Sequence, residues 1–135
     1  MIERKYNLKK SIIILCMSLV VANCRMVVNA EPTATGGVDG TNANGSVSYN
    51  SSSATAVTTY SRTGATIEAT ATAYYLLGNV IYQYKGNTST ASMGGTSATA
   101  TMPSNGDKVI GAKGFHHVRY GSGEWEATTD AGLTF

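Results

Sequence analysis

Two adjacent histidines, His116 and His117, are the side chains of this sequence best suited to acid–base or metal chemistry. Imidazole titrates near neutral pH and is the commonest protein ligand for transition metals. The surrounding residues 109–120 read as an extended strand, in which neighbouring side chains point to opposite faces. The two rings therefore do not converge on one metal ion. We expect one histidine to point inward and the other to be exposed.

A second candidate is a pair of carboxylates, Glu124 and Glu126, which flank Trp125 and share one strand face. Paired carboxylates serve calcium binding and glycoside hydrolysis, but glycosidase carboxylates normally face each other across a cleft. The aspartates show no calcium-loop spacing, and no serine lies in a nucleophile elbow. The sequence therefore predicts no catalytic residue, no metal site, no cofactor and no enzyme. A cleft that gathered these glutamates or Asp107 with a histidine would reopen the enzymatic interpretation.

Aromatic side chains are the third candidate. Tyr82 and Tyr84 fall on one face of the segment 80–84, and Tyr74 lies outward on the expected partner strand. Aromatic rings stack on sugars and provide rigid contact area for proteins. We interpret Tyr74, Tyr82 and Tyr84 as a possible ligand-binding platform. Core packing is the alternative, and we expect it to account for most tyrosines, with Trp125 central in the core.

Threonines at alternate positions predict outward rows on what we expect to be neighbouring strands. They are Thr66, Thr70 and Thr72 in one segment, with Thr99 and Thr101 in another. Flat threonine arrays occur on ice-binding proteins, but those usually carry strict repeats. Threonine is also a common residue on the polar face of a strand, which is the simpler interpretation.

Residues 1–30 have the order of a signal peptide: a basic start, an apolar run over 11–22 and small residues before a cleavage site. Cleavage is expected between Ala30 and Glu31, with cleavage after Ala22 as a weaker alternative. A membrane anchor would need about 20 apolar residues. A lipoprotein with Cys24 as the lipidated residue is disfavoured by Asn23. We therefore expect a secreted, extracellular protein that contacts a membrane only through this leader before cleavage.

Charge and cysteine content change once the leader is set aside. Both cysteines lie within residues 1–30, and residues 31–135 carry five basic and seven acidic side chains, a net charge of −2. The basic pI of the whole chain thus belongs to the leader, which argues against nucleic-acid binding. Without cysteines, the mature domain relies on its core instead of disulfides.

Alternation of apolar and polar residues predicts the fold. Residues 31–45 contain only one clearly apolar residue, and we expect a flexible tail there. Residues 46–135 form one domain of short strands, expected at 46–49, 53–60, 66–77, 80–84, 88–93, 97–102, 109–120 and 124–129. Hairpins are expected around 78–79 and 94–95. The fold class is all-β, an antiparallel β-sandwich of immunoglobulin-like size.

Four short stretches between Ala69 and Thr129 resemble small secreted β-sandwich proteins of Gram-positive bacteria. They are residues 73–75, 82–86, 98–103 and 114–121, the last followed by Trp125. These are structural strand-and-turn motifs. The resemblance implies an exported β domain and transfers no catalytic or ligand-binding residue.

These observations favour a non-enzymatic extracellular protein that binds a cell-surface or matrix component, either a glycan or a protein. The alternative is a secreted antagonistic factor, such as a bacteriocin-like toxin or an enzyme inhibitor. Low net charge and exposed strand edges are compatible with self-association.

Overall fold

The computed structural model describes residues 32–83, 87–91 and 94–132, which form nine β-strands. In chain order they are β1 (Thr33–Val38), β2 (Thr41–Asn50), β3 (Ser53–Tyr60), β4 (Thr66–Leu77), β5 (Val80–Gln83), β6 (Asn87–Thr90), β7 (Ser97–Pro103), β8 (Val109–Tyr120) and β9 (Gly123–Ala131). The predicted leader, with its cleavage site at Ala30 and Glu31, lies outside the described residues. No helix in the described part of the chain is long and apolar enough to cross a membrane.

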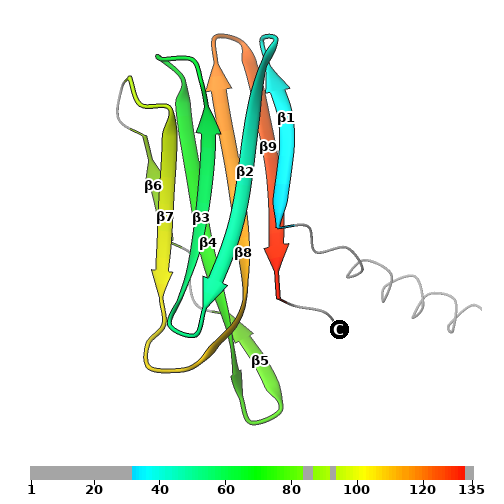
Figure 1. Cartoon of the computed structure of the whole chain (residues 1–135), viewed down its shortest axis with the longest axis vertical. Coiled ribbons are helices and arrows are strands. Elements are labelled where there is room, and N and C mark those ends of the chain that lie inside the picture. The colour runs from blue at the N-terminus through cyan, green and yellow to red at the C-terminus, as the bar shows by residue number, and fades with distance from the viewer. Residues whose placement is uncertain (1–31, 84–86, 92–93, 133–135) are drawn as a thin grey trace, which may run out of the picture. The chain divides into compact units, whose positions relative to one another are not determined.

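The strands form two sheets, both antiparallel throughout (Figure 1). Sheet A has the order β1-β2-β3-β7. Sheet B has the order β5-β4-β8-β9, and β6 pairs with β4 on the same side as β5. This arrangement confirms the predicted antiparallel β-sandwich.

Three predicted strands, at 53–60, 66–77 and 109–120, have the observed bounds of β3, β4 and β8. The hairpin predicted between residues 88–93 and 97–102 is wrong. β6 pairs with β4 in sheet B, whereas β7 pairs with β3 in sheet A. The chain therefore crosses from one sheet to the other around Gly94, so the threonine rows of β4 and β7 are not on neighbouring strands.

The structure also corrects the tail predicted over residues 31–45. Residues 33–38 form β1, and 41–46 form the part of β2 that pairs with it. Asp39 and Gly40 connect them with φ angles of 48° and 71°, as a two-residue type I′ hairpin turn requires. Backbone pairing holds this segment even though it has few apolar side chains. The Asp-Gly dipeptide was the sequence signal for the hairpin.

Small residues dominate the core between the sheets. Among the described residues, ten of the sixteen buried hydrophobic side chains are alanines, and the large ones include Tyr60 and Ile67. The expectation that most tyrosines pack in the core is wrong. Of those described, only Tyr60 is fully buried, and its hydroxyl donates to the Val38 carbonyl at 2.9 Å. Trp125 faces the interior but is only partly buried.

Glycines make room for two rings on the inner face of sheet B, those of Trp125 and His116. A Cβ atom on Gly36 of β1 would overlap the Trp125 indole, and one on Gly45 of β2 would overlap the His116 imidazole. The two rings stack with centroids 6.5 Å apart. The glycine-rich N-terminal segment is therefore a closely fitted cover for these rings.

Candidate functional site

The most prominent surface feature is the hairpin formed by β4 and β5, which projects beyond the end of the sandwich (Figure 1). β4 has 12 residues, whereas β3 and β7 of the facing sheet have 8 and 7. The tip of β4 therefore extends past the strands that cover its inner face. Leu77 lies on the same face of β4 as the buried Ala71 and Ala73, but it is 59% exposed for this reason.

Strand register places four side chains on one side of the hairpin, because directly paired residues in antiparallel strands share a face. Tyr75 pairs with Tyr82, and Leu77 pairs with Val80. We call these four residues the apolar hairpin face. The two tyrosine rings stack across the strands with centroids 5.7 Å apart. Val80 is 53% exposed and Tyr82 43%.

The predicted tyrosine platform is only partly supported by this geometry. Tyr74 pairs with Gln83, so it lies on the opposite side of the hairpin from Tyr82. Tyr84 lies outside the described residues. The partner of Tyr82 is Tyr75, which counting back from the Gly78-Asn79 turn would have identified.

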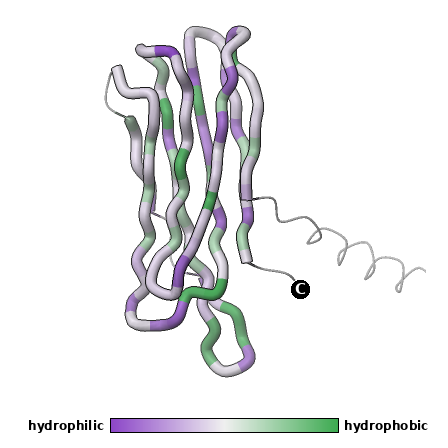
Figure 2. The backbone as a smooth tube through the Cα atoms, in the orientation of Figure 1, coloured by the Kyte–Doolittle hydropathy of each residue, from purple (hydrophilic) through white to green (hydrophobic). Residues whose placement is uncertain are grey.

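Apolar character also continues on the opposite side of the hairpin. Leu76 is 48% exposed and pairs with Ile81. Figure 2 shows hydrophobic residues along both strands of this hairpin. Contiguous exposed apolar surface on a small domain typically marks an interaction site. The apolar hairpin face is the stronger candidate, because three of its side chains are exposed, whereas Leu76 is the only exposed apolar side chain described on the opposite side.

His117 is the centre of a polar cluster on the outer face of sheet B. Its Nδ1 lies 3.1 Å from Oε2 of Glu68 on β4, and its Nε2 lies 2.7 Å from Oε1 of Glu124 on β9. Partial burial lowers the pKa of His117, but the hydrogen bonds and charges of the two glutamates outweigh burial and raise this pKa above its ordinary value. Glu126, paired in register with His117, completes the group.

His116 points inward and is fully buried, so the prediction that the two histidines take opposite faces is confirmed. The expectation that the second histidine is exposed is wrong, because His117 is partly buried between its glutamate partners. The Thr58 hydroxyl donates its proton to the backbone carbonyl oxygen of Glu68 at 2.7 Å. The same hydroxyl must therefore accept a hydrogen bond from Nδ1–H of His116, at 2.8 Å. Nε2 then accepts from the Thr129 hydroxyl at 2.8 Å. Burial lowers the pKa of His116 to about 4, and this neutral ring is structural.

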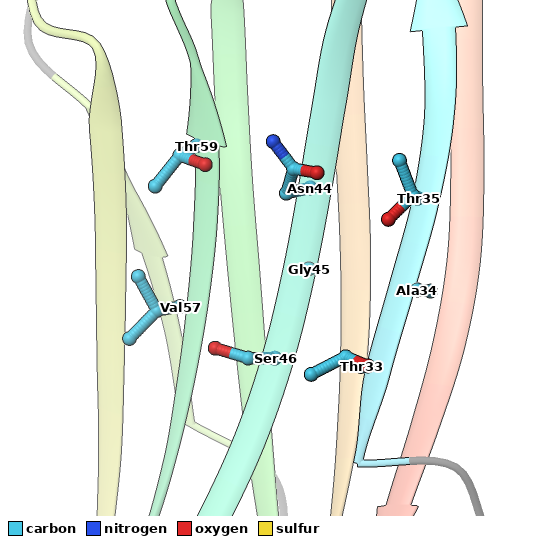
Figure 3. Close-up of a pocket in the computed structure, with 8 residues that line it drawn as sticks. All are labelled: Thr33, Ala34, Thr35, Asn44, Gly45, Ser46, Val57 and Thr59. Carbon is cyan, nitrogen blue, oxygen red and sulfur yellow. The ribbon is translucent and has the colours of Figure 1, made fainter.

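The outer face of sheet A carries hydroxyl and amide groups. Figure 3 shows a shallow trough across β1, β2 and β3. Its lining comprises Thr33, Ala34, Thr35, Asn44, Gly45, Ser46, Val57 and Thr59, none of which is charged. On the same face Thr55 and Thr101 approach each other at 3.4 Å, so the threonines of this sheet form cross-strand contacts.

Comparisons with protein-family models, with curated proteins and with solved structures give no match for this chain. The candidate sites are therefore argued from the arrangement of their side chains in the structure. Sequence reasoning missed Glu68 as the partner of His117, because that contact depends on the pairing of β4 with β8, 49 residues apart at these positions.

Proposed function

We propose that this chain is a non-enzymatic extracellular binding protein that attaches to a protein component of the cell surface or matrix through its apolar hairpin face. The observation that carries the proposal is the exposure of Leu77, Val80 and Tyr82 on a projecting hairpin. Leaving this surface in water is unfavourable by about 25 cal/mol for each Å² of apolar area. Burial against a partner recovers that free energy.

Two properties of the hairpin favour a protein over a glycan or a lipid bilayer. Leu77 and Val80 make no hydrogen bonds to sugar hydroxyls. The very tip is Gly78-Asn79, whose amide and peptide groups would lose their water in hydrocarbon, and each unsatisfied group costs several kcal/mol there. A protein partner supplies both apolar contact and hydrogen bonds.

The edge of β5 supplies a further means of attachment. β5 is the terminal strand in the order of sheet B, and its only partner in the described residues is β4. Free backbone groups on an edge strand pair with an extended segment of another chain, and neighbouring side chains then provide specificity. The apolar hairpin face lies beside this edge, so one partner segment can engage both.

Paired substitutions in the hairpin test the proposal. The double variant Leu77→Thr/Val80→Thr keeps good strand formers at both positions and is expected to weaken co-sedimentation with cells of the source organism at least about tenfold. Leu76→Thr is the matched control, since it makes the same change on the opposite side of the hairpin. We expect its binding to stay near that of the parent protein.

The nature of the partner is tested on the same cells. Protease treatment of the cell surface is expected to abolish binding, whereas glycosidase treatment leaves it intact. Binding that survives both protease and the double variant would reject the hairpin and favour a glycan held in the neutral trough of sheet A. Equal loss in Leu76→Thr would also contradict a specific apolar hairpin face.

Export makes a separate prediction. Mass spectrometry of the culture medium is expected to find the protein with Glu31 at its N-terminus, because Val28 and Ala30 present small side chains to the signal peptidase. An N-terminus at Asn23 would indicate the alternative site after Ala22. Recovery of the protein only in the cell pellet, with residues 1–30 still attached, would contradict secretion and with it the proposed extracellular role.

A further inference from the structure

Charge pairing on the outer face of sheet B is uneven. Arg119 of β8 pairs in register with Glu124 of β9, and Lys113 pairs with Asp130, so each of these acids has a basic neighbour. The His117 row differs, because the imidazole has a carboxylate on both sides. These are Glu68 on β4 and Glu126 on β9. With Glu124 also reaching His117 from the adjacent row, three carboxylates surround one imidazole.

We propose that His117, Glu124 and Glu126 bind one divalent transition-metal ion. One ligand atom from each residue can be chosen so that all three lie within 4.8 Å of one another. In a tetrahedral zinc site, ligand atoms are roughly 3.4 Å apart for metal–ligand distances of about 2.1 Å. The two glutamates are exposed, so small rotations of their side chains bring the ligand atoms to this separation.

Glu68 prepares the histidine for this role. Its carboxylate holds Nδ1 at 3.1 Å, which leaves Nε2 directed towards Glu124. Metal-binding histidines almost always donate their second ring N–H to a carboxylate or carbonyl, and that contact fixes the tautomer and the ring orientation. Only 15% of the His117 side chain is exposed, so the ring is a fixed anchor beside two adjustable carboxylates. Glu68 is a positioning residue here.

The donor set selects the class of metal. One imidazole nitrogen and two carboxylate oxygens suit zinc and its transition-metal neighbours, whereas calcium and magnesium prefer oxygen alone. Three protein ligands leave a fourth position for water. The ion would link β8 with β9 and neutralise the excess carboxylates. This inference is independent of the hairpin and of the proposed partner.

Calorimetric titration of the untagged, chelator-treated protein with zinc chloride tests the site. We expect saturable binding of one ion per chain, accompanied by a shift of the His117 ring signals in NMR spectra while those of His116 stay in place. His117→Gln is expected to weaken zinc binding at least about 100-fold. Glu68→Gln is expected to weaken it by about 10- to 100-fold, as loss of an outer partner usually does.

Asp130→Asn is the control, because Asp130 lies on the same strand and face as Glu126, two rows away and opposite Lys113. Its zinc affinity is expected to stay within about twofold of the parent. Glu126→Gln, at an exposed position, provides a second test if His117→Gln unfolds. The proposal would be overturned if zinc binding were not saturable, or if His117→Gln kept the parental affinity. It would also be overturned if Asp130→Asn lost as much affinity, or if calcium bound as tightly as zinc.

Discussion

Replacing Gly36 with alanine is expected to lower the free energy of unfolding by about 2–3 kcal/mol, the upper range for overpacking a core. A Cβ atom at this position would overlap Nε1 and Cδ1 of Trp125. The indole is rigid and stacks against His116, so either the ring or β1 must move. Urea unfolding followed by Trp125 fluorescence measures the loss of stability and reports any change around the indole, because Trp125 is the only tryptophan.

Gly37 offers a matched control one residue away. A Cβ atom there would contact only the Thr41 carbonyl oxygen, at an ordinary 3.7 Å. Gly37→Ala is therefore expected to leave the free energy of unfolding within about 0.5 kcal/mol of the parent value. Equal effects at both positions would show that the loss reflects the flexibility of β1, and the proposed role of Gly36 beneath Trp125 would be rejected.

Lowering the pH from 6.5 to 4 is expected to remove about 3 kcal/mol of stability through His116. Its pKa is about 4 in the folded protein, compared with 6.5 for an unperturbed histidine. Between these two values the unfolded chain binds a proton at His116 that the folded chain does not bind. The free energy of unfolding therefore falls by about 1.4 kcal/mol for each pH unit by which the pH is lowered. Well above pH 6.5 both states are neutral at His116, and this contribution is constant.

His117 contributes with the opposite sign and in a different pH range. Its folded pKa is raised above 6.5, so its stabilising effect is complete below pH 6.5 and disappears as the pH rises through the folded value. The variant His117→Gln removes this effect and leaves the His116 slope. Urea unfolding of this variant between pH 7 and 5 therefore isolates the buried ring.

NMR titration of the ring protons assigns the effect to His116. Its signals are expected to stay constant down to about pH 5 and then to shift with a midpoint near pH 4. As a second variant, Thr58→Val/His116→Leu/Thr129→Val replaces the whole hydrogen-bonded group with apolar side chains, a change that can be nearly neutral. Its stability is expected to lose the slope below pH 6.5. Titration of His116 near pH 6.5, or a flat profile in His117→Gln, would contradict the buried neutral ring.

Local pattern determined much of the secondary structure. Alternation of polar and apolar residues over 66–73 and turn residues at 78–79 predicted β4 and its turn into β5, because side chains on a strand alternate regardless of what the strand pairs with. The same alternation correctly separated His116 from His117. Binary pattern also indicated the all-β sandwich, since no segment showed a helical apolar stripe.

Only the tertiary structure decided which strands pair and where each face is covered. The turn residues at 94–95 suggested one hairpin of residues 88–93 and 97–102, but β6 and β7 join different sheets because their partners, β4 and β3, lie on opposite sides of the core. The exposure of Leu77 depends on where the facing strands end. The contact between Glu68 and His117 depends on the register of β4 with β8. Alternation has a range of a few residues, whereas pairing, coverage and the polar cluster arise from contacts between distant parts of the chain.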